Sequence, residues 1–356
     1  MSTEGDPAKQ FQIRDNQDIN GRKEPPLRFG IFSVCDHYPQ ELPRSSATLY
    51  SELQSQARLA DELGFNSFWI AEHHFHEYGV VPRPPILLSS IAAQTKRIKL
   101  GSAVAVLPFD NPLRSAEDYA MLDLISQGRL ELGVGSGYLQ HEFDGFGLDP
   151  LIRRQRFDEA LAIIRKAWTG ERFSFSGNHF QVDSLQLNVQ PFQSTPPIFI
   201  AVLRNEAAFF VGRQQMGMMM IPYASTEKLD ELQVACQSYR NEFSQSGGKA
   251  ENARIQFGLH TFCAKTTKHA RKFAREYMDR YVRTRLYAKQ RPFDELIEKK
   301  LIAVGDPDEI IRVARLYEDA GLTDFLMLMN FGGLPDDAVQ DSMRLIAKNV
   351  LPSFAN

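Results

Sequence analysis

Residues 68–76 of the chain read Phe-Trp-Ile-Ala-Glu-His-His-Phe-His. The apolar run at 68–71 predicts a short, buried strand of a parallel sheet, and a carboxylate and three imidazoles follow soon after it. In α/β proteins, functional sites form at the carboxyl ends of parallel strands. Because histidine ordinarily titrates near neutral pH, this cluster indicates proton transfer or metal binding. A solvated turn that is merely rich in histidine is the alternative, but Trp69 and Ile70 place the segment close to a core.

Strand-like and helix-like segments alternate outward from this stretch along almost the whole chain. The helix-like segments carry start signals such as Asn111-Pro112, a capping residue followed by proline at the first helical position. Eight strand-plus-helix units predict an α/β fold, a single (β/α)8 TIM barrel, because parallel strands need crossover connections and eight such units close into a ring. An open doubly wound sheet is the rival, although it usually has fewer strands. The strands are expected at 28–34, 67–71, 98–107, 130–134, 198–202, 218–222, 255–264 and 325–330.

The sequence predicts one folded domain after a polar leader. Residues 1–27 lack the apolar core of a signal peptide and are expected to be disordered, whereas residues 28–356 are expected to form the barrel. Two long connections, 170–197 and 288–305, are expected to be lids or insertions at the barrel rim. The first contains a hairpin-like segment at 173–182.

The composition favours a cytoplasmic protein that binds neither nucleic acid nor a membrane. The chain has 356 residues, of which 43% are hydrophobic, and its net charge of −3 gives no reason to expect a polyanionic partner. No apolar run approaches the ~20 residues that span a bilayer. Cys35, Cys236 and Cys263 are too few and too scattered for a disulfide framework or a zinc site.

No metal site is expected. The spacing of His74 and His76 imitates the His-x-His motif of metal-dependent barrel hydrolases, but such sites need further ligands from later strands. Among the remaining histidines only His260 lies in a later predicted strand. Asn330 stands at the end of the last strand, where an acidic ligand would be needed.

A glycine-rich loop, Gly133-Val-Gly-Ser-Gly137, follows the fourth predicted strand. Its spacing does not match the Gly-x-Gly-x-x-Gly dinucleotide fingerprint. Glycine lets the backbone approach a ligand closely, so the loop is expected to let a flat or phosphorylated ligand lie against the strand end. A histidine at a neighbouring strand end, held near neutral pKa, could serve there as a general acid or base.

In this order, the motifs of the chain resemble those of the bacterial luciferase-like, flavin-dependent monooxygenase family. The resemblance extends over about residues 28–350, and five motifs in the right order make it specific. They are Phe29-Gly-Ile-Phe32, Trp69-Ile-Ala-Glu-His-His-Phe75, Gly101-Ser-Ala-Val-Ala-Val-Leu-Pro108, Gly128-Arg-Leu-Glu-Leu-Gly-Val-Gly-Ser-Gly-Tyr138 and Glu142-Phe143 with Phe146-Gly147; the closing Asn330-Phe-Gly-Gly-Leu334 is similar as well.

The resemblance implies an FMNH2-dependent, two-component monooxygenase. Reduced FMN would be supplied by a separate flavin reductase and would react with O2 at the barrel mouth. The resulting flavin hydroperoxide would insert one oxygen atom into a small organic substrate. No metal is implied.

The resemblance also implies the site residues. The catalytic histidine falls on His73, with His74 beside it, and its acidic partner falls on Glu142. A cis peptide bond beneath the isoalloxazine ring would fall at Ala103–Val104. The other residues expected at the cofactor are Phe32, Glu72, Gly135, Ser136, Tyr138, Leu203 and Arg204, with the phosphate donors among Ser136, Tyr138 and Arg204.

The chain departs from the luciferase pattern in three places. The three places comprise four residues: Gly135 replaces a cysteine near the flavin, Leu203-Arg204 replaces an acidic and a hydroxyl residue, and Tyr223 replaces a tryptophan. These departures favour a monooxygenase with a substrate other than the long-chain aldehyde of luciferase. The alternatives are a deazaflavin-dependent oxidoreductase on the same barrel and a non-catalytic, flavin-binding partner subunit.

The chain is expected to form a homodimer. Luciferase-like barrels associate through helices early in the chain, and twofold dimers are the commonest closed assembly. The predicted helix 112–125 carries an apolar face that could pack against a second copy or equally against its own barrel. This face consists of Leu113, Ala116, Ala120, Met121 and Leu124.

Overall fold

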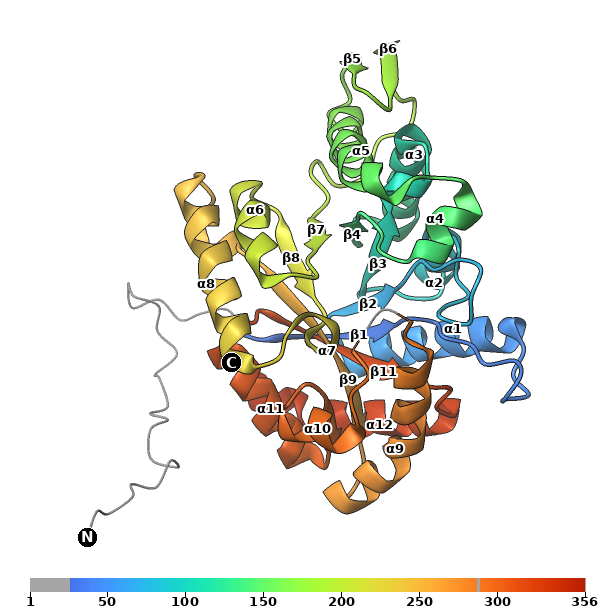
Figure 1. Cartoon of the computed structure of the whole chain (residues 1–356), viewed down its shortest axis with the longest axis vertical. Helices are drawn as coiled ribbons and strands as arrows, with labels where there is room; N and C mark the ends of the chain where they lie inside the picture. The colour runs from blue at the N-terminus through green and yellow to red at the C-terminus, as the bar shows by residue number, and fades with distance from the viewer. Residues whose placement is uncertain (1–25, 287–288, 356) are drawn as a thin grey trace.

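Eight parallel strands close into a barrel in the computed structural model, which describes residues 26–286 and 289–355 (Figure 1). The predicted leader therefore lies almost wholly outside the described residues. Each barrel strand pairs with the next, and the last pairs with the first, so the predicted TIM barrel is confirmed and the open sheet is wrong. The barrel strands are β1 (Arg28–Ser33), β2 (Ser67–Ile70), β3 (Lys99–Val106), β4 (Leu130–Gly135), β7 (Ile198–Ala201), β8 (Gly217–Met220), β9 (Ile255–Cys263) and β11 (Asp324–Asn330).

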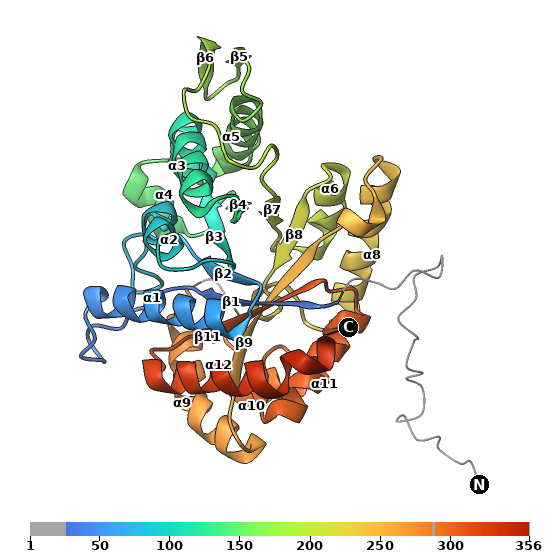
Figure 2. The same cartoon turned by 180° about the vertical axis from the view of Figure 1, so that it is seen from behind.

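Helices cover the outside of the barrel, as the two opposite views show (Figures 1 and 2). Local signals in the sequence explain where they begin and end. Ser45 accepts a hydrogen bond from the Thr48 backbone N–H at the start of α1, and Gly64 ends that helix in the left-handed conformation. The covering helices are α1 (Ser46–Leu63), α2 (Pro84–Ala92), α3 (Pro112–Ser126), α5 (Arg153–Ala167), α6 (Ala208–Arg213), α8 (Leu229–Gln245), α9 (Thr267–Thr284), α11 (Pro307–Asp319) and α12 (Asp336–Asn349).

Both long connections are insertions, as predicted. The first forms an antiparallel hairpin of β5 (Phe173–Ser176) and β6 (Gln181–Leu185), which projects from the barrel beside α5 at the top of Figure 1. The second carries α10 (Phe293–Glu298) and β10 (Ala303–Gly305), and β10 pairs in parallel with the end of β9. Neither α10 nor β10 was expected from the sequence.

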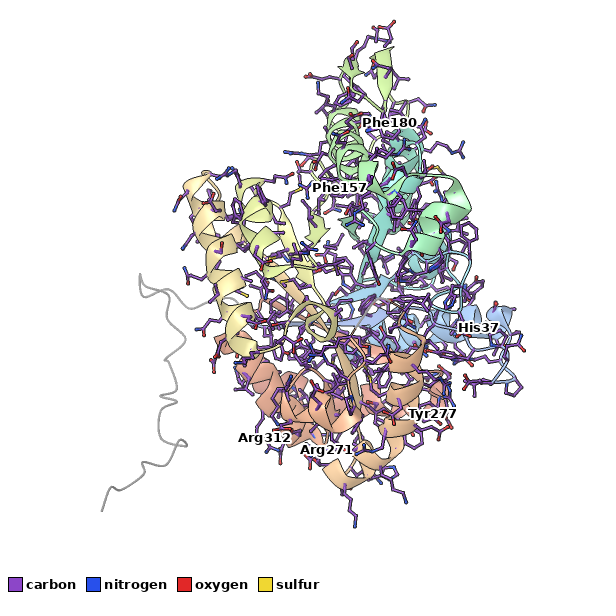
Figure 3. All side chains as sticks on the ribbon, in the orientation of Figure 1. His37, Phe157, Phe180, Arg271, Tyr277 and Arg312 are labelled. Atoms are coloured by element: carbon purple, nitrogen blue, oxygen red, sulfur yellow. The ribbon has the colours of Figure 1, made fainter. Side chains whose placement is uncertain are left out.

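Ion pairs connect the outer helices α9 and α11 near the second insertion. Arg271 of α9 and Arg312 of α11 both pair with Glu309, and Arg271 also donates to the Val304 carbonyl oxygen of β10; both arginines are labelled in Figure 3. No helix in the described part of the chain is long and apolar enough to cross a membrane.

A buried ionic cluster closes the amino-terminal end of the barrel. The Arg254 guanidinium lies 2.5 Å from Glu131 and 2.5 Å from Asp324, and Arg28 also binds Asp324, at 2.8 Å. Burial alone would raise the pKa of Asp324, but the two arginines lower it to about 2. Arg28, Arg254 and Asp324 stand at the starts of β1, β9 and β11, so the cluster ties three strands together.

Candidate functional site

A cavity of about 390 Å³ lies at the carboxyl ends of the barrel strands, where the sequence placed the site. Its lining is mainly apolar and comes from β1, β3, β4, β7 and β8 and from the loops that follow β2 and β4. The volume is within the usual range of small-molecule and cofactor pockets. Among the described residues no group of His, Cys, Asp and Glu could hold a metal ion.

Ala103 and Val104 line this cavity from the middle of β3. The peptide bond between them is cis, as predicted. The pairing of β3 with β4 breaks between Ser102 and Ala105, so both residues lack a partner on β4 and remain half-buried in an otherwise buried strand. Together they present a small apolar surface to the cavity.

Gly135 faces Val104 from β4. A Cβ atom at residue 135 would lie 2.6 Å from Cγ2 of Val104, which is far inside van der Waals contact. Glycine at this position therefore keeps the cavity wall at Val104 clear.

His73 and Glu142 form the central polar pair of the site. His73 Nδ1 lies 3.1 Å from Glu142 Oε1, and the same oxygen accepts the backbone N–H of His74 at 3.0 Å. Because a carboxylate only accepts, Nδ1 carries the proton of the neutral imidazole and Nε2 is left as the proton acceptor. Burial lowers the pKa of His73 and Glu142 raises it in part, so the ring is neutral at neutral pH.

The short helix α4 (Gln140–Phe146) carries Glu142 to this position. No helix was expected directly after the glycine-rich loop, so α4 is an addition to the predicted elements. Glu142 itself was identified by resemblance. Its side chain is 2% exposed, so the negative charge is shielded from water.

A second histidine–carboxylate pair lies next to the first. His74 Nε2 is 3.2 Å from Glu72 Oε1, while Glu72 Oε2 accepts the Val106 backbone N–H at 3.3 Å. Glu72 lines the cavity, and its burial raises the pKa of its carboxyl. The ring of His74 packs against Phe109 and Phe146 and does not belong to the cavity lining.

The structure therefore brings all but one of the expected site residues to a single cavity. His74 is the exception, and from this position it can act only indirectly, by holding Glu72. The expected residues that line the cavity are Phe32, Glu72, His73, Ala103, Val104, Gly135, Ser136, Tyr138, Glu142, Leu203 and Arg204.

Further lining residues were not identified from the sequence as part of the site. Tyr78 belongs to the same loop as His73, but nothing in the sequence of that loop indicates that its side chain lines the cavity. Tyr281 comes from α9, so only packing brings it to the cavity. Arg153 and Arg154 open α5 at the rim, and a paired arginine at a helix start could have indicated an anion site.

The rim thus carries three exposed arginines. Arg154 pairs with Asp158 at 2.9 Å. Arg153 and Arg204 have no carboxylate within 4 Å among residues 26–286 and 289–355, so their charges are available to an anionic ligand at the cavity mouth.

Known proteins similar to this chain have related activities. A family model described as luciferase-like monooxygenase matches residues 27–324. The oxygenase component of flavin-dependent trigonelline monooxygenase from Acinetobacter baylyi is 23% identical, over 92% of this chain and 96% of that protein. The F420-dependent glucose-6-phosphate dehydrogenase of Amycolatopsis mediterranei is 26% identical, over 76% of this chain and 86% of that protein. The crystal structure of monooxygenase RslO1 from Streptomyces bottropensis superposes with a TM-score of 0.87 at 29% identity and covers 92% of this chain and 100% of that chain.

Proposed function

The chain belongs to the luciferase-like monooxygenase family, and from this premise we propose that it is the oxygenase component of a two-component monooxygenase that uses FMNH2. In this proposal a separate flavin reductase supplies FMNH2, and one atom of O2 enters a small organic substrate. The observation that carries the proposal is the neutral His73, held by the buried Glu142, in the same cavity as the exposed apolar surface of Ala103 and Val104. The trigonelline relative, which is named as an oxygenase component, supports the two-component arrangement.

The residues of the cavity fit FMN. Ala103, Val104 and Gly135 offer a smooth apolar wall for a flat ring, because the side chain missing at residue 135 would otherwise meet Val104. Phe32 and Leu203 would add apolar contacts. The uncompensated charges of Arg153 and Arg204 suit a phosphate, for which arginine is the preferred bidentate donor.

Ser136 and Tyr138 also line the cavity, and we propose them as further hydrogen-bond donors to the cofactor. When bound in its reduced form, the flavin would supply the activation of O2. The chain supplies the proton handling, since His73 Nε2 can accept a proton while Glu142 holds the ring and stabilises the imidazolium that forms. The apolar lining excludes water from the reacting atoms.

A deazaflavin-dependent oxidoreductase is the second candidate, because one relative is named as F420-dependent. A non-catalytic partner subunit is the third, and the intact His73–Glu142 pair weighs against it. Anaerobic calorimetry separates the candidates. We expect photoreduced FMN to bind more tightly than oxidised FMN and than a reduced deazaflavin. Equal affinity for the two redox states of FMN, or preference for the deazaflavin, would contradict the proposal.

Turnover is the second part of this test. The protein is supplied with photoreduced FMN, O2 and a metabolite extract, and mass spectrometry follows products that gain one oxygen atom. Heat-denatured protein is the matched control, since free reduced flavin also reacts with O2.

We propose further that residues 28–356 form a single domain and that the protein acts in the cytoplasm. One continuous barrel includes nearly all of these residues. Cys35, Cys236 and Cys263 are all buried, free thiols, which is consistent with a reducing compartment.

A homodimer is proposed from the exposed face of α3. Ala116 and Ala120 are fully buried against their own barrel, so they do not contribute to a dimer contact. Met121, Leu124 and Ile125 are instead 52%, 43% and 48% exposed. The neighbouring helix α2, which packs against α3, adds an exposed Ile86.

Sedimentation tests this assembly. We expect a species of about twice the chain mass of 40.4 kDa, and we expect Leu124→Lys to convert it to monomer because a charge would be buried at the contact. Val234→Lys is the matched control, because Val234 is 70% exposed on α8, on the other side of the barrel (Figure 1). A wild-type mass that stays at 40.4 kDa with rising concentration would contradict the dimer.

A further inference from the structure

Four tyrosines from four separate segments line the cavity. They are Tyr78 in the loop after β2, Tyr138 in the loop after β4, Tyr223 in α7 (Pro222–Ser225) and Tyr281 in α9. The hydroxyls of Tyr78 and Tyr138 lie 2.6 Å apart, and the rings of Tyr223 and Tyr281 are in edge contact at 6.1 Å. We call these four residues the tyrosine cluster. The proton handling assigned to His73 and Glu142 does not use the hydroxyls of Tyr78, Tyr223 and Tyr281.

A buried cation lies against two rings of the tyrosine cluster. The Arg285 guanidinium is 3.7 Å from the ring centre of Tyr78 and 4.0 Å from that of Tyr281, and its side chain is 1% exposed. Arg285 does not line the cavity, whereas both rings do. Because arginine stays protonated at any ordinary pH, the two rings are held against a permanent positive charge.

This charge is only loosely balanced. Nη1 of Arg285 donates to the Tyr78 carbonyl oxygen at 3.0 Å, but Nη2 makes no hydrogen bond with residues of the described chain. The nearest carboxylate oxygen, of Asp36, is 3.8 Å away and already accepts hydrogen bonds from Tyr38 and from the Gly332 backbone N–H. The charge of Arg285 is therefore only partly compensated by a distant and shared carboxylate, and because a buried cation is costly, a further negative charge near it is favoured.

Within residues 26–286 and 289–355 no second carboxylate lies within 4 Å of Arg285. His260 faces Tyr223 and Tyr281 from β9, and burial and the charge of Arg285 lower its pKa to about 3, so it is neutral. Among the titratable groups of the described chain on which the charge of Arg285 acts, Asp36 is the only carboxylate. These groups are Asp36, Tyr38, His73, His76, Tyr78, Tyr138, Tyr223, His260 and Tyr281.

The tyrosine cluster also has hydroxyl protons that the described residues leave available for a ligand. A hydroxyl carries one proton, so in the Tyr78–Tyr138 pair one of the two protons remains free for a ligand. The Tyr281 hydroxyl forms no hydrogen bond with residues 26–286 or 289–355. The Tyr223 hydroxyl has only a long contact of 3.4 Å with the Lys289 carbonyl oxygen.

We propose that Tyr78, Tyr223 and Tyr281 of the tyrosine cluster, together with Arg285, form the substrate end of the cavity, with Tyr138 at the boundary to the cofactor. This end selects a planar organic substrate with an acidic hydroxyl, a phenol or an enol, bound as its anion. The inference rests on the proposed function, because it names the substrate class of the same site. Phenolates and enolates spread their charge over a flat skeleton, which suits hydroxyl donors on aromatic rings backed by a cation. A carboxylate would favour direct bidentate contact with arginine, and here the rings of Tyr78 and Tyr281 stand between Arg285 and the cavity.

The test uses the flavin-free protein without O2, so that it does not depend on the proposed reaction. The probe is 4-nitrophenol, whose anion absorbs visible light, and 4-nitroanisole is the matched probe without an acidic hydroxyl. Absorbance titrations at several pH values give the pKa of the bound probe. We expect that pKa to fall by about one unit relative to free probe, equivalent to about tenfold tighter binding of the anion.

Two variants assign this shift to the residues. We expect Arg285→Met to abolish the fall in probe pKa while it leaves 4-nitroanisole binding unchanged. We expect Tyr281→Phe, which removes one hydroxyl and little volume, to weaken binding of the anion about tenfold and to spare 4-nitroanisole. The phenylalanine variant decides the matter if the methionine variant does not fold, as judged by circular dichroism.

Three results would overturn the inference: no binding of 4-nitrophenol to the wild-type protein, a bound pKa that does not fall, or an anion affinity that Tyr281→Phe leaves intact. Each result is distinct from failure of the proposed function, which is measured by the preference for FMNH2. The protein could bind FMNH2 and fail this test, or pass this test and prefer another cofactor.

Discussion

Replacement of His73 by alanine is expected to lower turnover with FMNH2 and O2 by about 10²–10⁴-fold, the usual contribution of a general acid or base. His73 lines the cavity, and its Nδ1 is held by Glu142 at 3.1 Å, so the substitution removes the proton-accepting Nε2 from the site. The fold should persist, because the buried strand before the loop is untouched. Steady-state product formation together with the unfolding midpoint measures both effects.

His74→Gln is the matched control for this variant. The two histidines are adjacent, but the ring of His74 packs against Phe109 and Phe146 outside the cavity lining. Glutamine keeps a donor toward Glu72, so a much smaller loss is expected. Near-normal turnover of His73→Ala, or equal losses in the two variants, would show that the imidazole of His73 has only a structural role.

The pH profile gives an independent check on the same residue. Burial lowers the pKa of His73, so the ring stays neutral below its ordinary pKa of about 6.5 and activity should fall only at lower pH. Glu142 raises the pKa of His73, and Glu142→Gln removes that effect. The acid limb of kcat/KM is therefore expected to move to lower pH in Glu142→Gln. A limb that moves upward would assign the profile to another group.

Arg254→Met is expected to destabilise the protein by about 3–5 kcal/mol, the usual cost of removing one partner from a buried ion pair. The variant leaves Glu131 and Asp324, whose side chains are 5% and 3% exposed, close together without their shared cation. Denaturant unfolding at neutral pH measures the loss. Arg28→Met is the matched control, since Arg28 is 31% exposed and Asp324 would retain Arg254, so its cost should be smaller.

The effect of pH on Arg254→Met follows from the sign of the pKa shift. In the wild-type protein the pKa of Asp324 is lowered to about 2, so its contribution to stability is complete above the ordinary pKa of 3.8 and is lost as pH falls toward 2. Without Arg254 the buried carboxylates gain protons more readily, and protonation relieves their repulsion. The cost of the substitution should therefore be smaller at pH 4 than at pH 7, and a cost that grows with acid would contradict this account.

The sequence was sufficient for the barrel because its strands are short apolar runs separated by capped helices. All eight predicted strands are present, with ends that differ by one or two residues. The elements that were missed are short: α4, α10 and β10 have seven, six and three residues. Periodicity cannot identify segments of that length, and β10 exists only because it pairs with the end of β9.

Site residues that directly follow a strand were predictable from the sequence. Residues that reach the cavity only through the packing of distant segments were not. The regular alternation of side-chain direction along β2 ends with the strand at Ile70. The local sequence therefore does not determine which of the adjacent His73 and His74 faces the cavity. Tyr281 and Arg285 lie more than 200 residues from the loop after β2, and only the docking of α9 brings them to Tyr78. The resemblance to known motifs found His73, Tyr138 and Glu142, but it had no motif for Tyr78 or Tyr281.

The contact between Gly135 and Val104 has a consequence for how this barrel can diversify. With a Cβ at residue 135 only 2.6 Å from Val104 Cγ2, a larger residue at 135 is obstructed while valine remains at 104, and such overpacking typically costs 1–3 kcal/mol. The two substitutions are tolerated in the opposite order. A smaller residue at 104 leaves space, and a side chain at 135 can then occupy that space. The two positions should thus covary in size among homologues, and an evolutionary path that gives residue 135 a side chain must pass through a change at residue 104.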